Sequence, residues 1–391
     1  NIIVSFFISY ILVVGYISIF ISFILFPFAK ILVNIECLMI YIVFKTAEIT
    51  SCLPFSKISL VTPNIILIIL YYIIIFYFVI YFKNNKFKIL KAIINFKLII
   101  VVKKLFIFIT IIILISQINI VDFKLKIYFV DVQQGDCTLI RTPYGKNIII
   151  DGGEGNSEKY DYGEKVVYPY LLDRRIKKID YLVASHADSD HMGGLIYILE
   201  NMKVNHILIG IQPQNSKQLE KLIYIANKKN VKIVTLKHGD EIKIDKDVKI
   251  QVLFPVKNNL ISENSLNNNS LVFKLQYNKF SMMFTGDIEK IAENELVNLY
   301  EHNTSVIKTT ILKIAHHGSN SSSSKEFLEI VSPQIAVIGV GKDNKYGHPS
   351  EDVLLRLKNY GTKIYRTDES GEIEIEVKKN GKYKVKCHLC E

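Results

Sequence analysis

Apolar residues are concentrated in the first third of the chain, in four long runs. The runs cover residues 2–26, 31–44, 65–82 and 105–121, and Glu36 is the one charged residue among them. Three of them approach the length of about 20 apolar residues that crosses a bilayer as a helix. The run 31–44 is shorter, and a re-entrant or interfacial segment fits it as well as a span. We expect residues 1–121 to form an all-α transmembrane region, because the first run lacks the basic start of a signal peptide and more runs follow it.

From residue 123 the pattern changes to short apolar segments separated by turns. Such segments predict strands where they are continuous or alternate, and helices where apolar positions recur every three or four residues. The expected strands are 124–132, 137–141, 147–150, 179–184, 206–210, 231–236, 248–254, 271–277, 280–285, 311–315 and 335–340. The expected helices are 166–177, 193–201, 217–229, 291–300, 324–331 and 351–360. This alternation predicts that residues 122–391 form an α/β domain of two sheets faced by helices.

Charge predicts how the apolar runs are oriented. The segment from Lys83 to Lys104 carries seven lysines and no acidic residue. The positive-inside rule places such a loop in the cytoplasm, so the chain would be a multi-pass plasma-membrane protein with its C-terminal domain outside the cytoplasm. A patch for nucleic acid or anionic lipid is the alternative reading of these lysines.

Composition limits what else can be inferred. The part before residue 122 carries ten basic and two acidic residues, whereas the rest has a net charge of only +3, so the high pI is no evidence for a nucleic-acid partner. Five cysteines are scattered, and the tail from Cys387 to Cys390 is a lone CxxC, which is more typical of an unpaired or disulfide-bonded tail than of a metal site. The chain begins with Asn1 rather than Met, which indicates a fragment of a longer protein.

Four potential metal ligands directly follow the expected strand 179–184. They are His186, Asp188, Asp190 and His191, within the sequence SHADSDH. Imidazole nitrogens and carboxylate oxygens bind Zn²⁺ or Mn²⁺, and two ions held close together can activate water for attack on phosphorus or a carbonyl. The alternative is a polar turn that caps the next helix, but a cap accounts for one Asp or Ser and leaves both histidines unexplained.

Polar residues also follow three later strands. Asp287 follows 280–285, His316 and His317 follow 311–315, and His348 follows 335–340. Ligand-binding residues of α/β proteins concentrate in such loops. Asp287 is a candidate bridge between two cations, with a helix cap as the alternative. The serine-rich stretch after His317 offers hydroxyl and backbone N–H groups to phosphate oxygens, with a flexible loop as the alternative.

These residues resemble the metallo-β-lactamase fold, and in particular the C-terminal domain of the ComEC family of competence proteins. The matching strings cover nearly all of residues 124–377 in order: FVDVQQGD (129–136), DGG (151–153), SHADSDHMGG (185–194), NNNSLV (267–272), FTGDIE (284–289), AHHGS (315–319), YGHPS (346–350) and YRTDESG (365–371). The hydrophobic segment 53–79 is similar to the end of that family's membrane channel domain.

The resemblance implies an αββα sandwich with two divalent metal ions between its sheets. His186 and Asp188 would face one ion, Asp190 and His191 the other, and Asp287 would bridge them. His317 best matches the last ligand of the fold, with His316 as the alternative. The resemblance further implies that Asp131 lies behind the ligands and orients one of them.

The chain departs from the common HxHxDH pattern of this fold in two places. Asp188 replaces the middle histidine, and residues 267–269 are all Asn where a further histidine is usual. One ion would then have more oxygen ligands, which favours Mn²⁺ or Mg²⁺ over Zn²⁺.

The function that the resemblance implies is a phosphodiesterase that degrades single- or double-stranded DNA during uptake for natural transformation. Asp190 would be essential, and His348 or His316 would bind the phosphate or protonate the leaving oxygen. The scissile phosphate would be held by Ser319, Asn320 and Ser321. Two alternatives stay open: hydrolysis of another ester, and a DNA-guiding module without catalysis. Four spans are too few for a DNA pore, so we expect further membrane segments or a homo-oligomer, together with other proteins of the competence machinery.

Overall fold

The computed structural model describes residues 2–53, 61–63, 65–84, 123–156, 160–213 and 216–389. The chain divides into two compact units, Asn1–Leu60 and Val61–Glu391. The expected fourth apolar run, 105–121, lies outside the described residues, as does most of the lysine-rich segment after Lys83.

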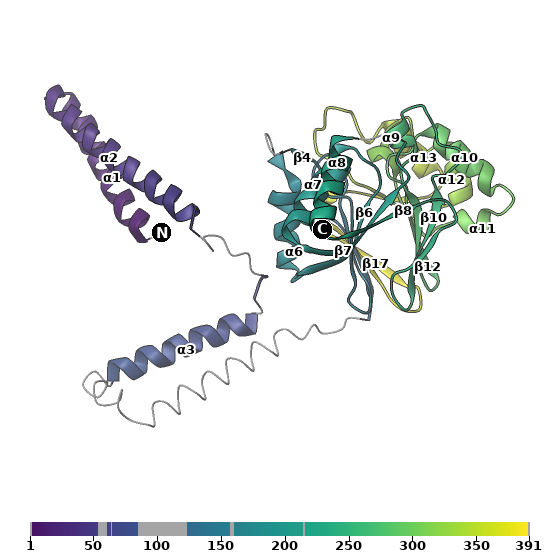
Figure 1. Cartoon of the computed structure of the whole chain (residues 1–391), viewed down its shortest axis with the longest axis horizontal. Coiled ribbons are helices and arrows are strands. Elements are labelled where there is room, and N and C mark those ends of the chain that lie inside the picture. Colours follow the sequence, from purple (N-terminus) through teal and green to yellow (C-terminus); the bar gives the residue numbers. More distant parts are fainter. Residues whose placement is uncertain are drawn as a thin grey trace. The chain divides into compact units, whose positions relative to one another are not determined.

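The first unit contains two apolar helices, α1 (Ile2–Ser22) and α2 (Phe26–Ser51) (Figure 1). Both are long and apolar enough to cross a membrane. The run 31–44, which is short by itself, is thus the middle of a 26-residue helix. Pro27 lies in the first turn of α2, where proline is tolerated because the first N–H groups of a helix have no partner inside it. A third helix, α3, spans Ile65–Asn84 and includes the third apolar run.

The C-terminal part contains two large mixed sheets. The first sheet has the order β17-β16-β1-β2-β3-β6-β7-β8 and the second β15-β14-β13-β12-β11-β10-β9. The strands of the first are β1 (Leu125–Phe129), β2 (Thr138–Arg141), β3 (Asn147–Ile150), β6 (Lys178–Ala184), β7 (Lys203–Gly210), β8 (Lys232–Leu236), β16 (Ile373–Val377) and β17 (Tyr383–Cys387). Those of the second are β9 (Glu241–Lys243), β10 (Val248–Phe254), β11 (Val272–Tyr277), β12 (Phe280–Phe284), β13 (Ile311–Lys313), β14 (Ile335–Ile338) and β15 (Lys363–Arg366). A two-stranded ribbon pairs β4 (Gly155–Asn156) with β5 (Tyr160–Asp161).

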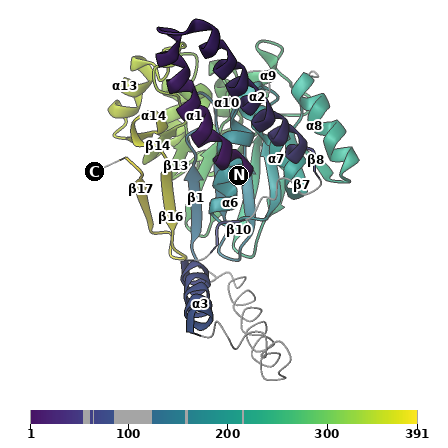
Figure 2. The same ribbon diagram turned by 90° about the vertical axis from the view of Figure 1, so that its left-hand side faces the viewer.

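Helices cover the outer face of each sheet. On the first sheet lie a π-helical turn at Gly163–Val167, α6 (Tyr168–Asp173), α7 (Ser189–Asn201) and α8 (Lys217–Lys228). On the second lie α10 (Lys290–Tyr300), α11 (Thr304–Ile307), α12 (Lys325–Val331) and α13 (Glu351–Asn359), while α9 (Ser265–Asn268) and α14 (Thr367–Ser370) are single turns. Figures 1 and 2 show the two sets of helices on opposite sides of the paired sheets. The expected α/β fold, an αββα sandwich, is confirmed.

Alternation along the strands builds three apolar layers. In β1, Leu125, Ile127 and Phe129 face the second sheet, and Tyr128 faces the helices of the first. In β12, Phe280 packs between the sheets, whereas Met283 packs under α10 and α12. Side chains at alternate positions of a strand point to opposite faces, so each strand contributes to two cores. The residues that follow β6, β12 and β13 are left at one edge of the sandwich.

Most strands lie where the apolar segments predict them, but the last part of the chain was missed. Strands β16 and β17 join the first sheet beside β1, although β16 begins about 240 residues after β1 ends. The alternation of Ile373, Ile375 and Val377 with glutamates is typical of a strand with one buried face. Cys387 is disulfide-bonded, one of the two states expected for the C-terminal tail.

Two glycines allow α7 to lie directly on the loop after β3. A Cβ atom on Gly194 would lie 2.0 Å from the carbonyl oxygen of Gly152, and one on Gly193 would lie 2.2 Å from the backbone nitrogen of Gly155. Both obstacles are backbone atoms, which cannot rotate away. The contact fixes the first turn of α7, which carries Asp190 and His191.

We expect Gly194→Ala to destabilise the C-terminal part by about 3 kcal/mol or more, since the added methyl group must push two backbone segments apart. The midpoint of thermal unfolding of the detergent-solubilised chain should fall by roughly 6 °C or more. Glu200→Ala, on the exposed side of the same helix, is the control and should leave the midpoint nearly unchanged. Equal midpoints for the two variants would contradict the packing argument.

Candidate metal centre

The residues expected to bind metal come together at the edge where the two sheets end. His186 follows β6, and His191 lies in the first turn of α7. Asp287 follows β12, and His317 lies in the short 3-10 helix Ala315–Gly318 after β13. The two sheets are joined here by the backbone N–H of Leu271, which donates to the carbonyl of Ser185 at 2.8 Å. Residues from three connections and both sheets therefore meet in one place.

Each of the three buried histidines is held through its Nδ1 atom. The Nδ1 of His191 lies 3.0 Å from the Asp151 carboxylate, and that of His186 lies 3.0 Å from the Ser185 hydroxyl. The Nδ1 of His317 donates to the carbonyl oxygen of Gly339 at 2.8 Å. Such bonds fix the ring orientation and the tautomer of a metal-binding histidine. In the described part of the chain, the Nε2 atoms of all three are buried and have no hydrogen-bond partner.

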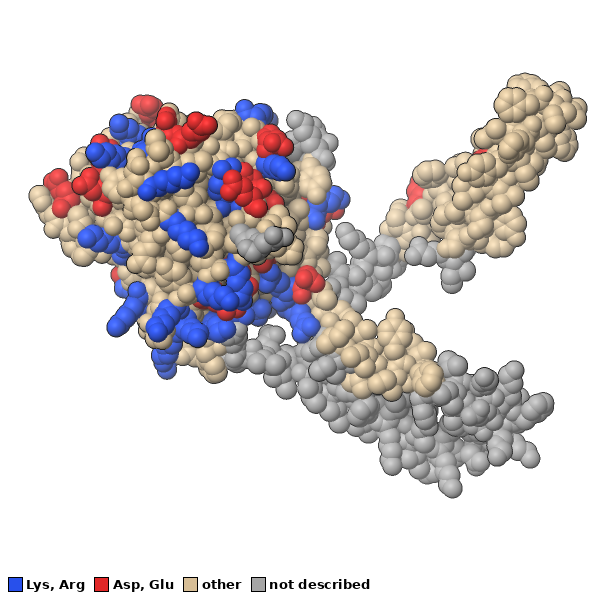
Figure 3. Space-filling model, turned by 180° about the vertical axis from the view of Figure 1, so that it is seen from behind, with Lys and Arg blue, Asp and Glu red and all other residues tan. Residues whose placement is uncertain are grey.

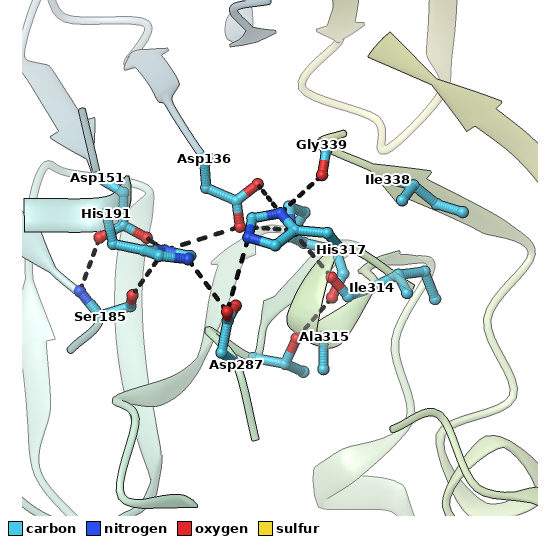
Figure 4. Close-up of polar contacts among 12 residues, drawn as sticks. Asp136, Asp151, Ser185, His191, Asp287, Ile314, Ala315, His317, Ile338 and Gly339 are labelled. Carbon is cyan, nitrogen blue, oxygen red and sulfur yellow. Dashed lines mark hydrogen bonds and ion pairs between the residues drawn. The ribbon is translucent and has the colours of Figure 1, made fainter. Parts of the chain in front are cut away.

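The free Nε2 atoms face carboxylates. The Oδ2 atom of Asp287 lies 3.2 Å from the Nε2 of His191 and 3.6 Å from that of His317 (Figure 4). Asp190 lies 3.4 Å from the Nε2 of His317, and Asp188 lies 3.6 Å from the Nε2 of His186. The arrangement thus has two parts, His191, His317 and Asp190 on one side and His186 with Asp188 on the other. Asp188 occupies the N-cap position of α7, but its side chain makes no capping hydrogen bond, which argues against the simple helix-cap alternative.

Asp136 and Lys313 form a buried ion pair behind the histidines. The Oδ2 of Asp136 lies 2.6 Å from the Lys313 ammonium. Asp136 also belongs to a cluster with His191, Asp287 and His317, in which one potential ligand atom from each residue lies within 4.8 Å of the others. Its contacts are with the Nδ1 sides of the rings, 3.9 Å from His191 and 3.7 Å from His317. Asp136 thus places negative charge beside the Nδ1 side of both rings, and Lys313 balances that charge. Sequence reasoning missed both residues, although Asp136 ends the motif FVDVQQGD.

The structure places Asp131 elsewhere. Its carboxylate accepts the backbone N–H of Gln133 at 2.9 Å, and the side chain is half-buried. Among the described residues Asp131 contacts none of the proposed ligands, whereas Asp151 holds the Nδ1 of His191. The two acidic residues that end FVDVQQGD and begin DGG were therefore the better sequence signal.

Electrostatics tie the histidines and carboxylates together. Burial opposes the charged form of His191, but Asp287, Asp190 and Asp151 outweigh it and raise its pKa well above the usual value. His317 has a raised pKa for similar reasons, with Asp287 and Asp136 as its main partners. Burial also acts against ionisation of Asp287 and Asp190, yet the neighbouring histidines hold both pKa values below the usual range. A protonated imidazole here takes the place that a cation can fill.

Three residues of the site have left-handed backbone conformations that non-glycine residues rarely adopt. Their φ angles are 55° at Asp151, 50° at His316 and 53° at His317. Each such residue costs on the order of 1 kcal/mol or more and persists where the surrounding structure enforces it. The strain coincides with the loops that aim His191 and His317 at Asp287.

The donor set fits divalent cations. Buried imidazole nitrogens without partners, together with carboxylate oxygens, are the ligands of Zn²⁺, Mn²⁺ and similar ions, and burial without a cation leaves them unsatisfied. Asp287 Oδ1 is also buried and lacks a partner among the described residues.

The asparagines 267–269 are buried, and two of them hydrogen-bond to backbone groups of neighbouring loops. Asn268 accepts the backbone N–H of Glu289 at 2.9 Å, and Asn269 accepts that of Ile261 at 3.0 Å.

The remaining predicted residues form a rim next to this cluster. The ring of His316 lies 5.8 Å from that of His348, and its Nδ1 lies 3.5 Å from Glu289. Because His317 rather than His316 faces Asp287, the geometry favours His317 as the ligand. Burial, followed by the charges of His316 and His317, lowers the pKa of His348, which favours its neutral form.

The serine loop beside His316 is held by its own hydrogen bonds. The hydroxyls of Ser319 and Ser321 lie 3.0 Å apart, and Ser321 donates to Glu289 at 3.0 Å. Asn320 is exposed. Deeper in the loop, the buried carboxylate of Glu293 accepts the backbone N–H of Ser324 at 2.7 Å, and Arg356 donates to the carbonyl of Ser323 at 2.9 Å. The stretch is therefore an ordered turn fixed by α10 and α13, unlike the flexible loop considered as an alternative.

Comparisons with known proteins agree with this geometry. A family model described as the metallo-beta-lactamase superfamily matches residues 130–342. ComE operon protein 3 of Bacillus subtilis is 34% identical over 264 residues, which are 65% of this chain and 33% of that protein. Competence protein ComA of Neisseria gonorrhoeae is 30% identical over 252 residues, 64% of this chain and 32% of the relative. Recombination protein 2 of Haemophilus influenzae is 30% identical over 248 residues, 63% and 28% of the two chains.

These similarities confirm the resemblance that the motifs indicated. The chain spans about a third of the length of these relatives. The similarity to these relatives and the two apolar helices together indicate that the protein is associated with a membrane.

We expect Asp151→Asn to weaken binding of divalent metal by roughly 10- to 100-fold, since the amide no longer holds the His191 ring through a carboxylate. Asp131→Asn is the matched control and should bind metal like the wild type. Isothermal titration calorimetry of each metal-stripped variant with Mn²⁺ measures its metal affinity. If Asp131→Asn has the larger effect, the assignment of the orienting role is wrong.

Metal binding should strengthen as the pH rises from about 6 to about 8. The raised pKa values of His191 and His317 keep both rings protonated to higher pH, whereas a metal ligand must be neutral, so binding displaces protons. Calorimetric titrations in two buffers of different ionisation enthalpy count the protons released. An affinity independent of pH, with no proton release, would contradict the electrostatic description.

Proposed function

Because the chain belongs to the metallo-β-lactamase superfamily, we propose that its C-terminal part, residues 122–391, is a binuclear metal-dependent phosphodiesterase that cleaves DNA during uptake. One observation carries the proposal. Three buried histidines, fixed through Nδ1, present unpartnered Nε2 atoms to Asp287 and its neighbouring carboxylates. A hydrolase fold with such a cluster is suited to divalent cations.

The proposed ligands follow the two parts of the cluster. His186 and Asp188 would hold one ion, Asp190, His191 and His317 the other, and Asp287 would serve both. When bound, such ions supply positive charge and Lewis acidity to a phosphodiester. The protein's own contribution is to hold the ligands in place: Asp151, Ser185 and Gly339 fix the rings, and the Asp136–Lys313 pair supports them from behind.

Oxygen-rich coordination supports a phosphodiester substrate and a hard metal. Asp188 lies beside His186 where the fold commonly has another histidine, which shifts the preference towards Mn²⁺ or Mg²⁺ and away from Zn²⁺. The rim adds groups that suit a phosphate: the neutral imidazole of His348, the Ser319 and Ser321 hydroxyls, and exposed Asn320. A neutral His348 is better suited to donating a hydrogen bond to phosphate than to protonating the leaving group.

The cellular setting is proposed from the relatives. One of them is named a competence protein, competence being the state in which cells take up DNA, and the apolar helices would tether this chain to a membrane. We infer a multi-pass plasma-membrane protein whose C-terminal domain lies outside the cytoplasm. It would act with other competence proteins or as a homo-oligomer, with single-stranded or double-stranded DNA as its substrate.

Cleavage of labelled DNA by the purified chain with Mn²⁺ tests the proposal. We expect Asp190→Ala and His191→Ala each to lower the rate at least about a thousandfold, because each removes a ligand of the same ion. His302→Ala is the control, since the His302 side chain is 94% exposed and its ion pair is with Glu301, outside the candidate centre. Wild-type activity in Asp190→Ala would refute the metal assignment.

The same assay separates the alternatives. Metal binding with hydrolysis of a generic ester but not of DNA would favour another substrate, and metal-independent DNA binding without any turnover would favour a guiding module.

Asp188→His restores the commoner ligand pattern and should shift the preferred metal from Mn²⁺ towards Zn²⁺. An unchanged metal preference would show that Asp188 does not set it.

A further inference from the structure

Exposed lysines gather at the end of the sandwich opposite the candidate metal centre. This end is formed by the turns that precede β12 and β13 and by the turn that joins β16 to β17. Figure 3 shows Lys and Arg side chains crowded along the lower side of the domain, whereas its upper side mixes both signs of charge. We call Lys279, Lys308, Lys378, Lys379 and Lys382 the basal lysine patch; all five are exposed.

The turns that carry the patch are neighbours in space. The Cβ of Lys279 lies 3.0 Å from the position that a Cβ on Gly381 would occupy, so the turn 378–382 lies against the turn 278–279. The backbone N–H of Thr310 donates to the carbonyl of Ser281 at 3.2 Å, which brings the turn with Lys308 beside the start of β12. No acidic residue occurs in these three turns. The patch is therefore one continuous basic surface.

Three carboxylates near this end have partners other than the patch lysines. Asp245 accepts a hydrogen bond from Thr142, and Asp247 lies 3.4 Å from the Tyr144 hydroxyl. Glu376, on β16, pairs with Lys124 at 3.3 Å and with Lys386 at 2.8 Å. Among the described residues the five patch lysines make no ion pair, so their charges repel one another unless an external anion lies over them.

Two exposed aromatic residues lie at the same end. Phe123, where the chain enters the domain, is 68% exposed, and Tyr144, in the turn between β2 and β3, is 44% exposed. The Tyr277 hydroxyl donates to the Phe123 carbonyl at 3.5 Å and fixes the entry point beside β11. Tyrosine is one of the two residue types that are enriched at the membrane–water interface. The residues that immediately precede Phe123 in the sequence include the apolar run 105–121.

We propose that the basal lysine patch docks onto anionic phospholipid headgroups at the surface of the membrane that holds the apolar helices. Lysine ammonium groups act as point charges for such a surface, and the patch contains no arginine, the residue that recognises individual phosphates through paired hydrogen bonds. Docking would point the opposite end of the sandwich, with the candidate metal centre, away from the membrane.

Nucleic acid is the less favoured occupant because the patch is remote from the site. The path along β12 from Lys279 to Asp287 spans eight residues, about 25 Å at a rise of roughly 3.3 Å per residue. DNA on the patch would thus lie a full strand length from the proposed ligands. The apolar run 105–121, in contrast, directly precedes Phe123 in the sequence, so a membrane that held this run would lie close to the patch.

Lysine footprinting of the full chain in nanodiscs tests the proposal. A membrane-impermeant acetylating reagent is applied in discs of phosphatidylcholine alone and in discs with about one third phosphatidylglycerol, and modification is measured by mass spectrometry. We expect the five patch lysines to react at least about threefold more slowly in the anionic discs, and the difference to vanish in high salt. Lys217, Lys221 and Lys228 on α8 are internal controls and should react alike in both.

Charge reversal provides the second arm. In the variant Lys279→Glu, Lys379→Glu, Lys382→Glu, the remaining Lys308 and Lys378 should lose their protection, whereas Lys217→Glu, Lys221→Glu, Lys228→Glu should leave the protection of the patch intact. Equal reactivity of the patch in both discs would overturn the proposal. So would protection that arises only when a single-stranded oligonucleotide is added to phosphatidylcholine discs, since that result assigns the patch to DNA.

Discussion

The position of Asp287 constrains the whole candidate centre. Asp287 follows β12 of the second sheet, and its carboxylate lies next to His191, which is in α7, the helix that follows β6 of the first sheet. Such a contact forms only if the ends of β6 and β12 lie at the same edge of the sandwich. It also requires that the Nε2 atom of each imidazole face Asp287. Hydrogen bonds at Nδ1, from Asp151, Ser185 and Gly339, supply that orientation. Helix α7 contributes by packing glycine backbone directly against the loop after β3.

Charge balance explains why so many ionisable groups tolerate burial together. Asp136 and Asp287 are almost fully buried, and a buried carboxylate is costly unless a positive partner is near. Lys313 provides one positive charge on the Nδ1 side of the rings, and protonated histidines or divalent cations provide the others on the Nε2 side. Positive partners on both sides of the rings thus offset the cost of burying these carboxylates.

Much of this could be predicted from the sequence. Continuous apolar segments located β6, β12 and β13, and the polar residues that follow them include His186, His191, Asp287 and the pair His316–His317, of which the resemblance favoured His317. The orienting residues could not be chosen in the same way. Asp131 and Asp136 lie in one motif, and only the fold shows that the second faces the rings. Likewise, β16 alternates visibly, but its pairing with β1 depends on contacts between distant segments that local pattern does not encode.

Metal ions bound at the centre can be located directly, without an activity assay. Anomalous diffraction at the manganese absorption edge, from crystals of the chain grown with Mn²⁺, tests the central claim. The account predicts two peaks beside Asp287, one next to the Nε2 atoms of His191 and His317 and one next to that of His186. Absence of a peak at Asp287 in crystals that hold manganese elsewhere would contradict it.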